Sequence, residues 1–171
     1  MILRVVRFPR LCLVVLAVWV VCGCTTARLI DTPAGFAPYD FGDRFEAISA
    51  DGVIVRAFIV EPPDSVDAAW PQWRRIDAAD RWLVARGATI DARSTALGSF
   101  DTRSGPAIAY EWATDEPSDE WIVMIAVIVG GDRWIVVEAA GPTDLYRVYE
   151  QWLLDAIERS DGFIVRAGSR R

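Results

Sequence analysis

The chain has 171 residues, with 18 basic and 24 acidic side chains, no histidine and a formal net charge of −6. Every basic residue is an arginine, and the three cysteines all lie within the first 24 residues. The rest of the chain therefore excludes catalytic triads, Schiff-base lysines, lysine-dependent phosphate loops, disulfides and metal sites built from imidazole or thiolate, so we expect no enzyme and no cofactor.

The first 23 residues have the pattern of a secretory signal. Three arginines within the first ten residues precede an apolar run over residues 11–21. That run is about eleven residues long, shorter than the roughly twenty of a membrane-spanning helix. It ends in Val21-Cys22-Gly23-Cys24, which resembles the lipobox of bacterial lipoproteins. The resemblance implies that residues 1–23 are removed and that Cys24 receives the lipid.

This anchor implies a location in the cell envelope, with the membrane as a partner. A lipoprotein cysteine carries three acyl chains, and two or more hold a protein stably on a membrane. Thr25 stands where an aspartate would favour the inner membrane, so the outer membrane is favoured, with the domain in the periplasm or at the surface. Without its signal the chain has 15 basic and 24 acidic residues, a net charge of −9, which would repel nucleic acid.

The remainder divides into a tether, one domain and a tail. Residues 24–38 combine Thr, Ala and Gly with two prolines and little periodicity, which predicts a flexible tether. Residues 39–165 form a single α+β domain, and residues 166–171 a disordered tail.

The domain begins with a predicted hairpin and helix. Two strand-like runs, 44–50 and 53–60, flank Asp51-Gly52, a strong hairpin signal because a type I′ turn needs positive φ at both positions. Pro71 suits the start of a helix and Gly87 its left-handed stop. The predicted buried stripe of this helix consists of Trp73, Ile76, Leu83 and Val84, with Asp80 inside it and Trp82 on the opposite side.

Four further strands and a second helix follow. The strands are predicted over residues 89–100, 107–114, 121–129 and 134–140. The run 121–129 is apolar at every second position on both faces, which is typical of a central strand covered on each side. Thr143 is the predicted N-cap of the last helix, whose predicted buried stripe consists of Leu145, Val148, Tyr149, Trp152 and Ala156.

This order, ββαββββα, predicts a mostly antiparallel six-stranded sheet with helices packed on it. It resembles the PsbP-like αβα sandwich, the fold of photosystem extrinsic subunits, a yeast Ran-binding import factor and DcrB-like bacterial lipoproteins. The resemblance rests on Asp51-Gly52-Val53, the helix end at Gly87, Ala109-Tyr110-Glu111 and Ile157-Glu158-Arg159-Ser160, and covers about residues 38–165. That fold serves many roles, so it implies no catalytic residues.

Carboxylates on the predicted strands are candidate ligands. Glu111, Glu138 and Asp91 each share a strand face with neighbours two residues away, and they would line one cleft if those faces coincide. Such a cleft could bind a small ligand or a hard divalent cation such as Ca²⁺, or support glycosidic acid–base chemistry. Alternatively, each carboxylate pairs with an arginine, for which the candidates are Arg56, Arg93 and Arg133.

Asp80 and the tryptophans suggest other sites. A buried Asp80 needs a partner, either an arginine or a ligand at the lip of a pocket. Tryptophan and arginine are enriched at protein interfaces, and we expect Trp70 and Trp82 to be exposed there, so that Trp82→Ala weakens partner binding without lowering stability. The leading interpretation is a lipid-anchored, non-enzymatic binding or assembly factor for another envelope protein. The alternative is a small-ligand or cation-binding lipoprotein.

Overall fold

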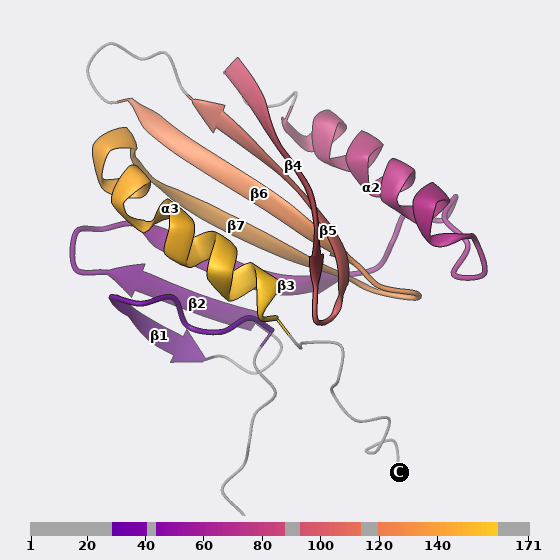
Figure 1. The fold of residues 1–171 in the computed structure, drawn as a ribbon, viewed down its shortest axis with the longest axis horizontal. Helices are drawn as coiled ribbons and strands as arrows, with labels where there is room; N and C mark the ends of the chain where they lie inside the picture. Colours follow the sequence, from indigo (N-terminus) through magenta and orange to yellow (C-terminus); the bar gives the residue numbers. More distant parts are fainter. Residues whose placement is uncertain (1–28, 41–43, 88–92, 114–119, 161–171) are drawn as a thin grey trace, which may run out of the picture.

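The computed structural model describes residues 29–40, 44–87, 93–113 and 120–160. These residues form one seven-stranded sheet, antiparallel at every pair, with helices on both faces (Figure 1). The elements in chain order are β1 Phe36–Asp40, β2 Arg44–Ser49, β3 Ile54–Val60, α2 Gln72–Gly87, β4 Arg93–Thr102, β5 Gly105–Ala113, β6 Trp121–Val129, β7 Trp134–Pro142 and α3 Thr143–Glu158. Across the sheet the strands run β1-β2-β3-β7-β6-β5-β4.

Strand β6 lies between β5 and β7 and is buried from both sides. Its side chains alternate between two separate apolar clusters, with Met124 in the cluster below α3 and Ile125 in the cluster below α2. A strand that must bury both faces needs a layer on each side. The prediction of a doubly covered strand over residues 121–129 is therefore confirmed, as is the α+β class.

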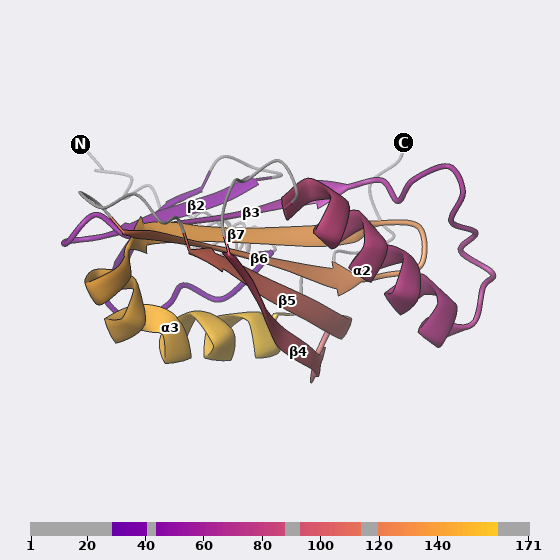
Figure 2. The ribbon, with the colours of Figure 1, turned by 90° about the horizontal axis from the view of Figure 1, so that it is seen from above.

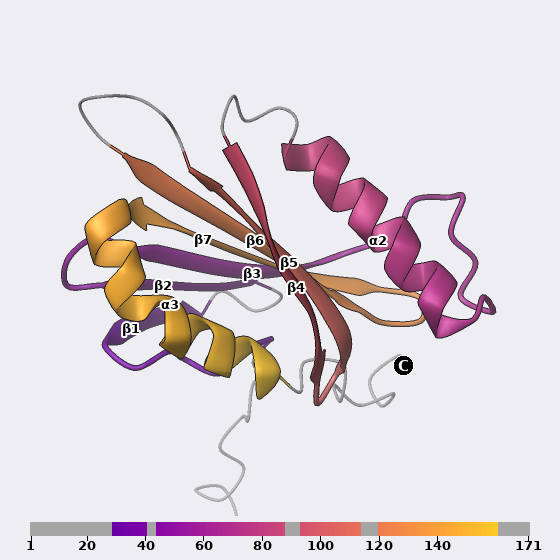
Figure 3. The same cartoon turned by 45° about the horizontal axis from the view of Figure 1, so that its top comes forward.

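The two helices cover different parts of the sheet. Helix α2 packs on β5 and β6, whereas α3 packs on the opposite face over β7, β6 and the end of β4. Figures 2 and 3 show α3 below the sheet toward the β1 side and α2 toward the β4 side. Among the described residues, no helix combines the length and the apolar character needed to cross a bilayer.

Helix α2 is rotated relative to its predicted orientation. Its buried residues include Ala78, Ala79 and Leu83, while Trp73 is 69% exposed and Val84 50% exposed. Two alanines let the helix approach a sheet that already carries large tryptophan side chains, whereas the periodicity analysis gave most weight to large apolar residues. The predicted stripe was therefore partly wrong.

Helix α3 shows the same kind of error. Tyr146, Leu153 and Ile157 are buried, whereas Val148 is 63% exposed and Trp152 42% exposed. The predicted N-cap was also wrong. Pro142 occupies the cap without a side-chain bond, and the Thr143 hydroxyl instead donates to the backbone oxygen of Glu120 at 2.9 Å.

Residues 29–38 belong to the domain, which corrects this part of the predicted tether over residues 24–38; residues 24–28 lie outside the described residues. Leu29 and Ile30 are buried in the core below α3, and Ser160 donates a hydrogen bond to the Leu29 carbonyl. Strand β1 then pairs with β2 as a seventh strand. It escaped the sequence analysis because Pro38 reads as a strand breaker, yet proline is tolerated on an edge strand such as this one.

Two glycines serve different purposes. Gly52 has φ of 91° in the β2–β3 turn, but Asp51 does not have positive φ, so the predicted type I′ geometry is wrong at its first position. Gly87 ends α2 without positive φ. A Cβ at Gly87 would lie 2.0 Å from the ring of Trp112, so close packing, and not a left-handed stop, requires glycine there.

We expect Gly87→Ala to lower the free energy of unfolding by about 1–3 kcal/mol because the methyl group overpacks the Trp112 site. Helix propensity alone would raise the free energy of unfolding of the same variant by up to about 1 kcal/mol, so the two effects have opposite signs. Chemical denaturation measures the difference. Gly131→Ala is the matched control because a Cβ there has no neighbour closer than 3.9 Å; equal behaviour of the two variants would contradict the packing argument.

Candidate functional site: the open half of the sheet

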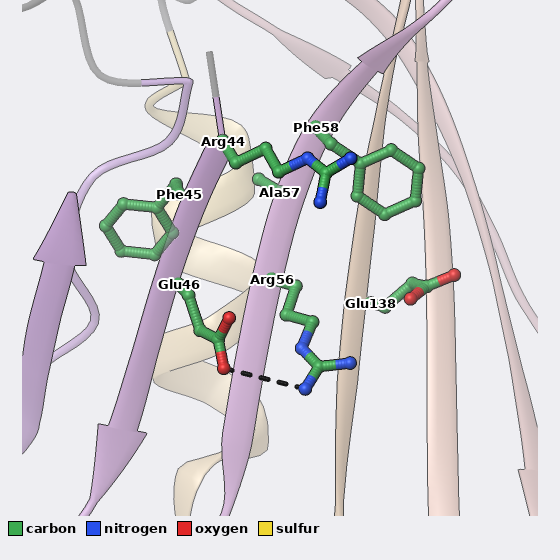
Figure 4. A pocket seen from close by; sticks show the side chains of 7 residues that line it. All are labelled: Arg44, Phe45, Glu46, Arg56, Ala57, Phe58 and Glu138. Carbon is green, nitrogen blue, oxygen red and sulfur yellow. Dashed lines mark ion pairs between the residues drawn. The ribbon is translucent and has the colours of Figure 1, made fainter. Parts of the chain in front are cut away.

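The part of the α2 face formed by β2, β3 and the end of β7 is covered by neither described helix. A hollow of about 430 Å³ lies there, and Figure 4 shows the side chains around it. The lining residues are Arg44, Phe45, Glu46, Arg56, Ala57, Phe58 and Glu138. We call this surface the open face.

Strand register arranges the open face in rows that cross three strands. Glu46, Arg56 and Glu138 are directly opposite one another on β2, β3 and β7. The neighbouring row on one side consists of Arg44, Phe58 and Val136. The neighbouring row on the other side consists of Ile48, Ile54 and Ala140. A charged row is thus flanked on both sides by rows that are largely apolar.

The charges of the open face form ion pairs. A nitrogen of Arg56 lies 3.5 Å from a Glu46 oxygen, as the dashed line in Figure 4 shows. Arg86, in the last turn of α2, donates to Glu138 at 2.6 Å. Exposed pairs of this kind contribute about 0–1 kcal/mol each, so they organise the surface more than they stabilise the fold.

Arg44 differs from these residues. It is exposed and pairs with no other residue in the described part of the chain. In Figure 4 its side chain extends across β3 toward Phe58. Within the described residues, the open face therefore presents the positive charge of Arg44 without an ion-pair partner, beside the ring of Phe58.

The geometry of this surface suits recognition. The carboxylates of Glu46 and Glu138 are separated by the β3 strand and by Arg56, so they do not converge on one point. Within the described residues no group of three acidic side chains could hold a metal ion. The surface combines a row of alternating charges with the half-buried apolar side chains of Ile48, Ile54 and Phe58.

The two carboxylates predicted to share a cleft lie on opposite faces of the sheet. Glu111 is opposite Met124 on β6, whereas Glu138 is opposite Ile125. Met124 and Ile125 are consecutive, and consecutive strand residues point to opposite faces. The condition for a shared cleft, coinciding strand faces, is therefore not met by Glu111 and Glu138, and Asp91 lies outside the described residues.

Glu111 is only 4% exposed and faces α3. Arg147 binds both of its oxygens at 3.0 Å and also contacts Glu150 at 2.8 Å. The fully buried hydroxyl of Tyr146 has no hydrogen-bond partner within the described structure. Burial, followed by the negative charge of Glu111, raises the pKa of the Tyr146 phenol. This arrangement is a buried, neutralised carboxylate beside a phenol that stays protonated.

The carboxylates pair with arginines, as one alternative predicted, but mostly with different ones. Arg147 and Arg86 bind Glu111 and Glu138, and of the three predicted arginines Arg56 binds Glu46. Arg133 lies 3.9 Å from the adjacent Asp132. The Arg93 side chain is outside the description.

Asp80 has a different partner from the predicted arginine. It accepts a hydrogen bond from the Tyr110 hydroxyl at 2.7 Å. This bond, together with partial burial and the charge of Asp80, raises the pKa of Tyr110.

The predicted interface tryptophans are less exposed than expected. Trp82 is half-buried and packs edge-to-face on Trp134 with ring centres 6.1 Å apart. Trp70 is also half-buried and lies under the Arg74 guanidinium at 3.7 Å. The more exposed rings belong to Trp73, Trp121 and Trp152. Cys24, the predicted lipidation site, lies before the described residues.

Arg44, Glu46 and Phe58 were missed as site residues. The signal was present, because Arg44 and Glu46 alternate with apolar residues on one strand of the predicted hairpin, and Arg56 and Phe58 do so on the other. Which of the two hairpin faces stays uncovered depends on where the helices dock, and the hairpin sequence does not contain that information.

Comparisons with known proteins support the fold. No family model and no curated protein matches the sequence. Among solved structures, LpqN of Mycobacterium tuberculosis, described as involved in cell envelope biogenesis, matches with a TM-score of 0.53 and 10% identity, over 75% of this chain and 78% of that one.

Cyanobacterial PsbP from Synechocystis matches with a TM-score of 0.42 and 14% identity, over 74% of this chain and 80% of that one. A protein of Bacteroides thetaiotaomicron matches with a TM-score of 0.45 and 9% identity, over 83% of this chain and 46% of that one. At these identities the likeness concerns the fold alone, and of the three matches the argument for it rests on LpqN.

We expect Trp82→Ala to lower the free energy of unfolding by about 2 kcal/mol, because it removes a large half-buried ring and its edge-to-face contact with Trp134. Urea denaturation followed by circular dichroism measures the loss. Trp73→Ala is the matched control on the same helix and should cost less than about 0.5 kcal/mol, since that ring is mostly exposed. A stable Trp82→Ala protein would instead support the original interface prediction.

Tyr146 should make stability depend on alkaline pH. Because its folded-state pKa is raised above the unfolded value of about 10, the native state favours the protonated phenol, and stability should fall as pH rises above about 10. Tyr146→Phe should reduce this fall. At pH 8 the variant should remain within about 1 kcal/mol of the wild type, since the hydroxyl has no partner to lose. Urea denaturation of both proteins at pH 8 and at a pH above about 10 tests this prediction. A large loss of stability of Tyr146→Phe at pH 8 would contradict it.

Proposed function

We propose that this chain is a lipid-anchored protein of the cell envelope that acts as a non-enzymatic binding or assembly factor for another envelope protein. The observation that carries the proposal is the open face, the part of the sheet over β2, β3 and the end of β7 that neither described helix covers. The lipobox-like residues 21–24 support the location, and Thr25, in place of an aspartate, favours the outer membrane. The same fold in LpqN, a protein described as involved in cell envelope biogenesis, supports the setting.

The composition of the open face favours a protein partner. Arginine and aromatic residues are enriched in protein interfaces, and such interfaces combine an apolar centre with a polar rim. Here Phe58, Ile48 and Ile54 supply half-buried apolar surface beside the charged row. Paired charges around an apolar centre direct orientation and specificity more than affinity.

The charges also describe the partner. Arg44 has no counter-ion among the described residues, so the matching surface should carry a carboxylate opposite it. Glu46 and Glu138 already have arginine partners, so the partner surface need not supply positive charges for them. The expected partner is therefore a protein surface with apolar side chains and one acidic residue adjacent to them.

A small ligand is the second candidate, and the size of the hollow is the observation that favours it. A volume of about 430 Å³ lies within the range of small-molecule sites, roughly 300–1,000 Å³. An anionic ligand would pair with Arg44. The carboxylate pair first suggested for a cation does not support this candidate, because Glu111 and Glu138 are on opposite faces.

Site-specific photocrosslinking in the native envelope tests the first proposal. A photoreactive amino acid at Ile48, on the open face, should give one adduct of defined mass with an envelope protein. The same residue at Val148, exposed on the opposite face, is the matched control and should not give that adduct. Mass spectrometry identifies the partner.

Charge reversal refines the same experiment. Arg44→Glu should abolish the Ile48 adduct without lowering stability, whereas Arg133→Glu, an equal charge change at the β6–β7 turn, should preserve it. Equal adducts from positions 48 and 148, or an adduct insensitive to Arg44→Glu, would contradict the proposal. Absence of any adduct would favour the small ligand.

A further inference from the structure

A second groove lies on the α2 face at the other end of the sheet, between α2 and the edge strand β4. It has a volume of about 380 Å³. Helix α2 contributes Trp73, Asp77 and Asp80 to one wall, and Tyr110 of β5 contributes to the floor. This groove shares no residue with the open face.

The β4 wall of the groove consists of small residues. Ala96, Gly98 and Ser99 line it, and all three are exposed. Gly98 has φ of 101° and follows an irregularity in the pairing with β5. Because these residues have little or no side chain, nothing from β4 fills the space in front of Trp73, whose ring is 69% exposed.

Strand β4 ends the sheet on this side. Within the described structure its inner edge pairs with β5 and no strand pairs with its outer edge. Protein edges are often protected by charged residues, proline or a β-bulge. Residues 94–100, Ser-Thr-Ala-Leu-Gly-Ser-Phe, contain no charged residue and no proline, and the irregularity between Ala96 and Gly98 interrupts the strand at one point. An extended segment can hydrogen-bond to an edge of this kind, while a pocket beside it selects the side chains.

The charge of the groove is negative and incompletely compensated. Asp77 pairs with Arg81, but Asp80 forms no ion pair with a described cationic residue and receives only the Tyr110 hydroxyl bond. Asp80 and the exposed indole of Trp73 line the same groove, about two helical turns apart on α2. A long basic side chain fits this combination, since its cationic end would pair with the carboxylate while its aliphatic stem lies along the groove toward the indole.

We propose that the outer edge of β4 binds an extended, cationic peptide segment of a partner protein as an added strand. One basic side chain of that segment enters the groove, pairs with Asp80 and packs on Trp73. This site is independent of the open face, so either can fail without the other.

Titration of the purified full-length protein in detergent tests the proposal. The probe is a blocked peptide of sequence Thr-Val-Thr-Arg-Thr-Val-Thr, whose arginine and valines share one strand face. Binding should shift the NMR amide signals of residues 94–100 and protect from hydrogen exchange those alternate amides of this stretch that point away from β5. Replacing the central arginine of the peptide by glutamate should abolish binding.

Two variants locate the basic side chain. Asp80→Asn keeps a hydrogen-bond acceptor for Tyr110 but removes the charge, and should weaken peptide binding about tenfold, the effect of losing a charge-assisted hydrogen bond. Trp73→Ala should weaken it by a smaller factor. Asp132→Asn is the matched control, an equal charge change on an exposed turn, and should leave affinity unchanged.

Three results would overturn the proposal. The first is no binding at millimolar peptide, and the second is equal affinity for Asp80→Asn and the wild type. The third is full protection of the β4 amides in the protein without peptide, which would show that the edge is already occupied.

Discussion

The constraint on which this structure depends is the ratio of sheet to helix. Seven strands spaced about 4.8 Å apart form a sheet roughly 29 Å wide, whereas one helix covers about 10 Å. Each face of the described sheet has a single sixteen-residue helix. The face below α3 is completed by Leu29, Ile30 and Phe36 from the N-terminal segment. On the other face, the connection between β3 and α2 contributes the partly buried Val66 to the cluster below α2, and no described segment covers the open face. An uncovered half and an accessible edge groove are therefore consequences of the architecture.

Burial explains which charges take part in recognition. Glu111 is buried, and its pairing with Arg147 offsets the cost of desolvating a carboxylate, so it belongs to the structural core. Glu46, Arg56 and Glu138 stay solvated, so their pairs can rearrange at little energetic cost. Arg44 and Asp80 have opposite charges and lie at opposite ends of the same face, and neither has an ionic partner in the described part of the chain.

Much of the fold follows from the sequence, but the relative placement of elements does not. The double apolar pattern of β6 and the Asp51-Gly52 turn are local signals, and both indicated correct elements. Strand β1 was missed because its Pro38 is acceptable only at an edge. The helix faces were misjudged because alanines such as Ala78 and Ala79 contribute little to an apolar pattern yet determine close approach. The site shows the same limit, since the relative faces of Glu111 and Glu138 depend on how their strands pair with β6.

The burial of Leu29 also limits the distance between the domain and Cys24. Leu29 follows Cys24 by five residues, and five extended residues reach at most about 17 Å. If Cys24 carries the lipid, five residues are too few for a long stalk, so the domain would stay close to the bilayer surface. It would diffuse laterally together with its lipid anchor. A partner would then be met by a two-dimensional search within one leaflet. Membrane proteins with short extramembrane parts and surface-bound lipoproteins would be within reach, whereas a protein confined to the opposite membrane would not.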